Sequence, residues 1–331
     1  MRSATDVPDS LEHPQLRHIN EGTCLSGLAI ERYQNSMWYI LAAPLLYEHI
    51  IVTHMKQLES AVEAADHFPL VRDPDDNRKL GSFVKRLDLL IPDLKWTLEF
   101  DHDPPLLALA PRLCKLTPNL IILNTKSTRH WDSLPMRDII SPTLEYVYWI
   151  NNFRLPISQW VAFMDSHPRL RYMDPPIFEN PERSKETKEM WQGKSWPSIQ
   201  ELTWHHDEQA SMFASQFDTG SFPNLHNLVL TYGPTSSHLD EILSVHGVNI
   251  TSIHFQPTAR NFKHIVPLLN TIRYHCPRLR ELRLSCFGDE NYLEKDVEPP
   301  PSLLSIPGIT VFGLHYSGQS PTGPVRILIT T

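Results

Sequence analysis

The sequence predicts an α/β solenoid, in which a short unit of helix and strand repeats along the chain, preceded by a short helical module. The first observation is a proline that recurs before apolar runs, in the pattern Pro-x-[Leu/Ile]-x-x-apolar. The second is the interval between these runs, irregular but about 26 residues, which is typical of repeat proteins. The third is a helical pattern of apolar residues between several of the runs.

Each run follows the template L-x-x-L-x-L, the strand segment of a leucine-rich repeat. Runs beginning at Val84 and Ile250 share the template without the proline. The first apolar residues of the units are Val84, Leu120, Leu144, Leu170, Ile199, Leu225, Ile250, Leu279 and Ile309. Nine units in one frame, none with a glycine-rich phosphate loop, favour a leucine-rich-repeat-like horseshoe. An ordinary α/β domain with proline before its strands is the alternative.

Helices are expected between the strands. Residues 157–164 and 262–269 have apolar residues at i, i+3, i+4 and i+7, the second stretch after an N-cap at Asn261, and a third helix is expected over 237–246. The following proline cannot continue a helix and favours an extended residue before it. One unit cannot bury its apolar face alone, so neighbouring units must stack.

The first eighty residues depart from the repeat. Residues 24–48 are expected to be mainly helical, with Pro44 opening a second short helix, and 50–52 to form an edge strand. Thr53 is expected to cap the next helix, and the polar stretch 72–79 to be a loop. The predicted division is a helical module at 1–54, a helix and linker at 55–80, the solenoid at 81–316 and a C-terminal tail at 317–331.

Two segments carry a resemblance to a family. Residues 42–50 (AAPLLYEHI), followed by a helix and 81–89 (GSFVKRLDL), resemble many fungal F-box proteins, in which the end of the F-box leads into a first repeat. Residues 275–284 (HCPRLRELRL) are similar to the units of F-box proteins with leucine-rich repeats. The Leu-Pro-x-Glu segment that opens an F-box is not present, so the resemblance is to a degenerate or N-terminally truncated F-box.

The resemblance implies a substrate receptor of an SCF ubiquitin ligase. The helical module would then contact a Skp-type adaptor, and the repeats would choose the target. The adaptor contacts implied are Trp38, Leu41, Leu45 and Leu46. A repeat scaffold that has lost the adaptor contact is the alternative.

Composition excludes several other classes of protein. A net charge of -8 argues against nucleic acid as the main partner. No apolar stretch is long enough to cross a membrane, and the first twenty residues lack the apolar core of a signal peptide. Four cysteines in 331 residues do not make a disulfide framework. We therefore expect an intracellular protein of the cytoplasm or nucleus, with no membrane contact.

The sequence contains no recognisable catalytic, cofactor or metal motif. No two of the 17 histidines have helical spacing, and the stretch 205–208 (HHDE) is expected to be a solvated turn rather than a metal site. Residues 193–195 (GKS) lack the glycines of a phosphate loop, and Cys276 has no zinc partner. We expect no cofactor and no enzymatic activity; an enzyme without a known motif is the third alternative.

The binding surface is expected on the strands. In L-x-x-L-x-L the first, fourth and sixth residues point into the core, while the third and fifth point out of the concave sheet. Three tyrosines fall at outward positions of neighbouring strands, and tyrosine is enriched at binding hot spots; alternatively, the rings pack against one another or under a loop. The predicted contacts with a protein target are Tyr146, Tyr148, Tyr172, Asp174, Glu201, His254, Glu281 and Arg283.

Overall fold

The chain folds around one large sheet. The computed structural model describes residues 44–67, 79–91, 105–125, 139, 141–148, 154–179, 188–204, 207–231, 236–255, 265–287, 308–317 and 325–330. Eleven strands lie in the order β1-β2-β3-β4-β6-β8-β9-β10-β11-β12-β13, which is their order in the sequence. All neighbours are parallel except β12 and β13, which are antiparallel. The predicted α/β class is confirmed.

The strands of this sheet are short. They are β1 (His49–Val52), β2 (Arg86–Leu89), β3 (Ile122–Asn124), β4 (Tyr146–Tyr148), β6 (Tyr172–Met173), β8 (Glu201–Trp204), β9 (Asn227–Leu230), β10 (Ser252–Phe255), β11 (Glu281–Phe287), β12 (Val311–Ser317) and β13 (Val325–Thr330). A separate parallel pair is formed by β5 (Arg154–Leu155) and β7 (Ile177–Phe178).

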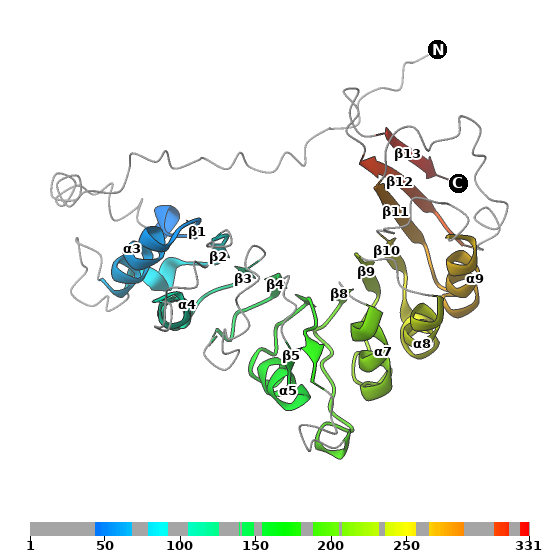
Figure 1. Cartoon of the computed structure of the whole chain (residues 1–331), viewed down its shortest axis with the longest axis horizontal. Coiled ribbons are helices and arrows are strands. Elements are labelled where there is room, and N and C mark those ends of the chain that lie inside the picture. Colours follow the sequence, from blue (N-terminus) through cyan, green and yellow to red (C-terminus); the bar gives the residue numbers. More distant parts are fainter. Residues whose placement is uncertain are drawn as a thin grey trace, which may run out of the picture.

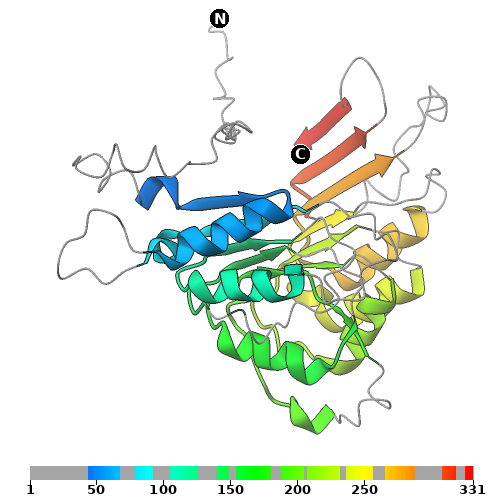
Figure 2. The same cartoon turned by 60° about the vertical axis from the view of Figure 1, so that its left-hand side comes forward.

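The helices lie on one side of the sheet. They are α3 (Met55–Asp66), α4 (Pro105–Leu116), α5 (Ile157–Ser166), α7 (Asp207–Gln216), α8 (Ser236–His246) and α9 (Ile265–His275), with short 3-10 turns η1 (Leu80–Phe83), η3 (Lys188–Met190) and η4 (Gly247–Asn249). In Figure 1 the elements follow an arc, with helices on its outer side and strands on its inner side, and the turned view in Figure 2 keeps the helices on one side. The other side of the sheet is called the inner face below.

The strand frame predicted from the sequence is confirmed by the register. Third-position residues of neighbouring units are Cα partners, as in the row Tyr146, Tyr172, Glu201. Fourth-position residues form the next row and are buried, as Leu202 and Leu228 show. The stack is also joined at the second position, where one backbone carbonyl accepts two N–H groups of the next unit. The Glu145 carbonyl, for example, accepts from the amides of residues 171 and 172 at 2.8 and 3.1 Å.

The recurring proline occupies the second position of a turn between helix and strand. The carbonyl of the residue before the proline accepts the N–H of the first strand-frame leucine, at 3.0 Å between His167 and Leu170. Proline suits this position because its fixed φ matches the turn and its missing N–H is not needed.

The two units without proline use glycine at the start of the same turn. The carbonyls of Gly81 and Gly247 accept from Val84 and Ile250 at 3.2 and 3.1 Å. A Cβ at Gly81 would overlap the Leu116 carbonyl oxygen, and one at Gly247 would lie 2.7 Å from the carbonyl oxygen of His275. Glycine therefore lets these turns approach the C-terminal end of the next helix.

The helices agree in part with expectation. The predictions over 157–164 and 237–246 are confirmed by α5 and α8; α9 overlaps the predicted 262–269, whose N-cap Asn261 lies outside the described residues. The predicted cap of α3 was wrong by one residue. His54 is extended there and its ring nitrogen Nδ1 accepts from the Gln57 amide, whereas Thr53 bonds the Gln57 side chain.

Two helices were not predicted. Prolines at positions 105 and 111 of α4 obscured its pattern, although the first of them starts the helix, where a missing N–H costs nothing. Helix α7 begins at Asp207, so the second half of the 205–208 stretch is helical rather than a turn; the two histidines lie outside the described residues.

The sheet extends into both flanking segments. The expected edge strand at 50–52 is confirmed as β1, which starts at His49 and lies at the edge of the sheet. It keeps the register of the strands that follow, because His49 pairs with Arg86 and Val52 is fully buried. At the other end β13 falls within the segment 317–331. The domain boundaries themselves stay predictions.

Candidate functional site

The candidate site lies at the middle of the inner face. It comprises Tyr146, Tyr148, Tyr172, Asp174 and Glu201, hereafter the inner-face patch. The parallel register of β4, β6 and β8 places Tyr146, Tyr172 and Glu201 in one row across the three strands. Strand alternation predicts that all five side chains point away from the helices, and the structure brings them together.

Two members of the patch are buried rather than open to a partner. Tyr172 is 8% and Asp174 is 1% exposed. The Tyr172 hydroxyl donates to Asp174 Oδ1 at 2.8 Å and lies 2.8 Å from Thr203 Oγ1. Burial and the neighbouring Asp174 carboxylate raise the pKa of Tyr172 far above its usual range. These residues therefore form the base of the patch. Asp174 is too buried to make the contact with a protein target that the sequence predicts for it.

The other two tyrosines are half-buried. The rings of Tyr148 and Tyr172 lie 4.4 Å apart between centroids, tilted by 35°. Burial raises the pKa of Tyr148, and the negative charge of Glu201 adds to the shift. The alternative that the rings pack against one another holds for Tyr172 and Tyr148. Tyr146 and Tyr148 keep exposed surface, and their predicted contact with a partner stays a prediction.

Glu201 is a half-buried carboxylate of the inner face. Its Oε2 accepts from the Asn227 amide at 3.3 Å, and no Lys, Arg or His of the described residues forms an ion pair with it. Burial raises the pKa of the Glu201 carboxyl; the Asn227 hydrogen bond and the distant charges of His226 and Arg283 oppose this only in part.

The remaining predicted contacts lie further along the same face. Glu281 and Arg283 of β11 form an ion pair, with Arg283 Nε 2.6 Å from Glu281 Oε1, and Ser252 Oγ donates to the second carboxylate oxygen at 3.2 Å. His254 of β10 is the Cα partner of Arg283 and is half-buried. Strands β9 and β10 separate Glu281 from Glu201, so the predicted residues form two groups on one face.

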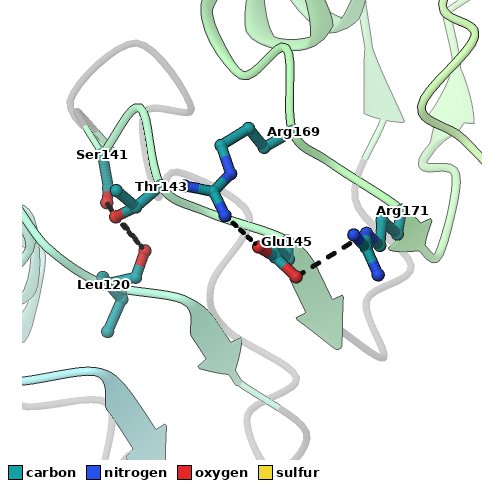
Figure 3. Close-up of polar contacts among 6 residues, drawn as sticks. All are labelled: Leu120, Ser141, Thr143, Glu145, Arg169 and Arg171. Carbon is teal, nitrogen blue, oxygen red and sulfur yellow. Dashed lines mark hydrogen bonds and ion pairs between the residues drawn. The ribbon is translucent and has the colours of Figure 1, made fainter.

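A polar rim at the start of the strands was not predicted. Glu145, at the second position of its unit, accepts from Arg169 at 2.7 Å and lies 3.7 Å from Arg171 Nε (Figure 3). In the neighbouring turn the Ser141 hydroxyl donates to the Leu120 carbonyl at 2.7 Å. These contacts join successive units. Glu145 and Arg171 stand at second positions, which the template leaves unassigned, and Ser141 and Arg169 lie before the first position of their units.

The remaining candidates are the metal, phosphate-loop and cysteine positions. In the part of the chain that the structure describes, no three His, Cys, Asp or Glu side chains gather as a metal site would require. The GKS stretch lies in a turn in which Lys194 pairs with Asp165. Cys276 is buried as expected, and burial raises its thiol pKa to about 12, which leaves it without nucleophilic thiolate at neutral pH.

The predicted adaptor contacts are only partly within the described residues. Leu45 and Leu46 lie in a helical turn at 44–46, just before β1, and are 73% and 65% exposed. Trp38 and Leu41 lie outside the described residues. None of the described helices is long and apolar enough to cross a membrane. The chain matches no protein-family model and no curated protein.

Proposed function

We propose that this protein is a non-catalytic protein-recognition module, a leucine-rich-repeat-like solenoid whose inner face binds a protein target. The observation that carries the proposal is the unbroken register from β1 to β12. It aligns third-position side chains of every unit in one row, without a helix of the described residues covering that face. Such a row offers a continuous surface that varies from strand to strand, as target recognition requires.

The inner-face patch is the proposed centre of binding. Tyr146 and Tyr148 combine large apolar rings with polar hydroxyls, and the Tyr148 ring packs against Tyr172, which is fixed by its hydrogen bond to Asp174. Rings already held in place lose little freedom when a partner binds, which favours affinity.

The test is a double change, Tyr146→Ala/Tyr148→Ala, with Tyr274→Ala as the matched control. Tyr274 is 82% exposed on α9, away from the inner face. A target captured by the unchanged protein should be captured equally by the control and lost by the double variant, since a tyrosine at a hot spot contributes about 2 kcal/mol or more. Equal capture by all three proteins would refute binding at this patch, and a large fall in melting temperature would make the rings structural.

A more specific form of this proposal is a substrate receptor of an SCF ubiquitin ligase. The exposed Leu45 and Leu46 immediately before β1 favour it, because two adjacent apolar side chains at the start of the sheet suit an adaptor contact. A repeat scaffold without the adaptor is the alternative form. Co-purification of the full chain with a Skp-type adaptor separates the two.

A further inference from the structure

The carboxylates of the inner face are unequally neutralised. Asp88 lies 2.7 Å from His49 Nε2 and 3.0 Å from Arg86 Nε. Glu281 is paired with Arg283 on its own strand. Glu201 has the Asn227 amide and no ion-pair partner among the described residues, although it is half-buried. An amide hydrogen bond does not neutralise the negative charge, and the charges of His226 and Arg283 offset its burial only in part, so a cation bound at Glu201 would stabilise the carboxylate.

The surroundings of Glu201 suit a cation with a flat or compact head. Tyr146 lies two strands away in the same row, about 10 Å by the usual strand spacing, with the buried Tyr172 between them. Tyr148 covers part of Tyr172 and lies within the electrostatic influence of Glu201, whose charge raises the Tyr148 pKa. Aromatic faces attract cations through the negative charge of their π systems, and Arg also stacks on them.

We propose that Glu201, Tyr146 and Tyr148 bind a basic side chain, arginine or lysine, of the protein target. This inference rests on the proposed function and adds the chemistry of the bound group. A basic group would form a charge-assisted hydrogen bond with Glu201 while its carbon stem or guanidinium lies against the tyrosine rings. A basic partner also suits a protein whose net charge is -8.

The electrostatics of Glu201 agree with this occupant. Burial raises the pKa of the Glu201 carboxyl because the Asn227 hydrogen bond and the charges of His226 and Arg283 offset the desolvation of the charged form only in part, so compensation of this charge is incomplete. A bound cation would supply that compensation. A neutral or acidic side chain would not, and an acidic one would also meet the charge of the neighbouring Asp174.

The experiment presents a displayed library of random dodecapeptides to the full chain. Five proteins are compared: the unchanged chain, Glu201→Gln, Glu201→Asp, Glu145→Gln and the double variant Tyr146→Ala/Tyr148→Ala. Glu145 is the matched control, because it is a carboxylate just before β4, two strands from Glu201, that already has Arg169 and Arg171 as partners (Figure 3). Enriched peptides are then synthesised with each basic residue replaced by its neutral counterpart, citrulline for arginine and acetyl-lysine for lysine.

We expect the unchanged chain and Glu145→Gln to enrich peptides that share a basic residue. Glu201→Gln should weaken their binding about tenfold or more, the size of effect seen when one partner of a desolvated charge pair is removed. Glu201→Asp, which keeps the negative charge, should retain part of the peptide binding that Glu201→Gln loses. The neutral-counterpart peptides should bind about tenfold more weakly to the unchanged chain and be insensitive to Glu201→Gln.

The outcomes separate the two proposals. Enriched peptides without a basic residue, or equal weakening of charged and neutral peptides by Glu201→Gln, would overturn the basic-side-chain inference and leave the recognition function standing. An unchanged chain that enriches no peptide, or peptides that bind Tyr146→Ala/Tyr148→Ala normally, would overturn the recognition function at this patch and the inference with it. Melting temperatures of all variants identify any loss of binding that comes from unfolding.

Discussion

The two sides of the sheet are built from the same strands but obey different rules. Toward the helices, the fourth-position residues from β2 to β11 are all apolar and at most 1% exposed, as Leu87 and Leu282 illustrate. Toward the inner face, the third position holds Arg86, Tyr146 and Glu201 within five neighbouring strands. Packing therefore fixes one side, because every fourth-position side chain must be buried against the helices, while the third-position side chains on the other side are not held to one residue type.

The largest effect is expected from the buried leucines of the core side. Leu228→Ala or Leu282→Ala should lower the free energy of unfolding by roughly 2–5 kcal/mol, because each removes a buried side chain and leaves a cavity. The adjacent inner-face changes Asn227→Ala and Glu281→Ala should cost less than about 1 kcal/mol, since both side chains are half-buried and their contacts are single hydrogen bonds or surface ion pairs. Chemical denaturation measures all four. Equal losses for leucines and neighbours would show that the two sides are not separable.

The second prediction concerns the turns that connect the two sides. Gly81→Ala and Gly247→Ala should each cost about 1–3 kcal/mol, because the added methyl would meet a backbone carbonyl that cannot move without shifting the next helix. Gly193→Ala has open space around it but a φ of 81°, so its cost comes from backbone strain alone and should be smaller. Melting curves of the three variants give the ranking. A Gly81 variant as stable as the unchanged protein would mean that the close approach at this turn is not needed.

The third prediction concerns how the stability of the core depends on pH through two buried histidines. His246 is buried against Phe213 and Phe222, with ring centroids 5.6 and 6.2 Å away, and burial lowers its pKa to about 4 although Asp218 opposes the shift. His167 is buried too, and its pKa is lowered for the same reason. Because the folded-state pKa lies below the ordinary value near 6.5, their neutral form stabilises the fold fully above that pH. This stability is lost as the pH falls toward 4.

The measurement is denaturation at pH 7.5 and at pH 5. The unchanged protein should be less stable at the lower pH, and His246→Phe, which keeps an aromatic ring without a titrating group, should lose less. His275 is the control position, since it lies beside Asp240 at 2.8 Å instead of in the aromatic core. If His246→Phe and the unchanged protein show the same pH dependence, the buried histidine is not its source.

The side of the sheet that packs against the helices could be predicted from the sequence better than the inner face. The period, the strand frame and the helices α5 and α8 follow from apolar spacing, which burial imposes on every unit. Helix α4 was missed because the stop signal of proline also occurs at a helix start and, at Pro111, inside the helix. The glycine turns were missed because their signal is a lack of side chain, which has meaning only beside the Leu116 or His275 carbonyl.

On the inner face, the alternation of side chains along a strand predicted which way each side chain points but not whether it is exposed to solvent. Tyr172 and Asp174 point to the expected side, yet they are buried. Neighbouring strands lie about 4.8 Å apart, so the large Tyr148 ring covers its neighbour Tyr172, whose hydroxyl then needs Asp174 and Thr203 as partners. This crowding depends on the side chains of two neighbouring strands at once, so it cannot be predicted from the sequence pattern of one unit.

The last prediction extends the comparison to the edge of the sheet, where the effect should be smallest. At this edge β1 follows the repeat frame, yet Leu45 and Leu46 just before it are exposed instead of packed against the stack. If they contact a Skp-type adaptor, the full chain should bind it weakly, because the segment that opens an F-box is not present in the sequence. Leu45→Ala/Leu46→Ala should then remove the remaining binding without changing stability. Met190, an apolar residue elsewhere that is 56% exposed, is the control, and Met190→Ala should keep the binding.

Calorimetric titration of the adaptor into the three proteins measures this binding. Tight binding by the unchanged chain would contradict the weak contact and strengthen the ligase-receptor form of the proposal, whereas weak binding that survives the double change would place the contact on other residues.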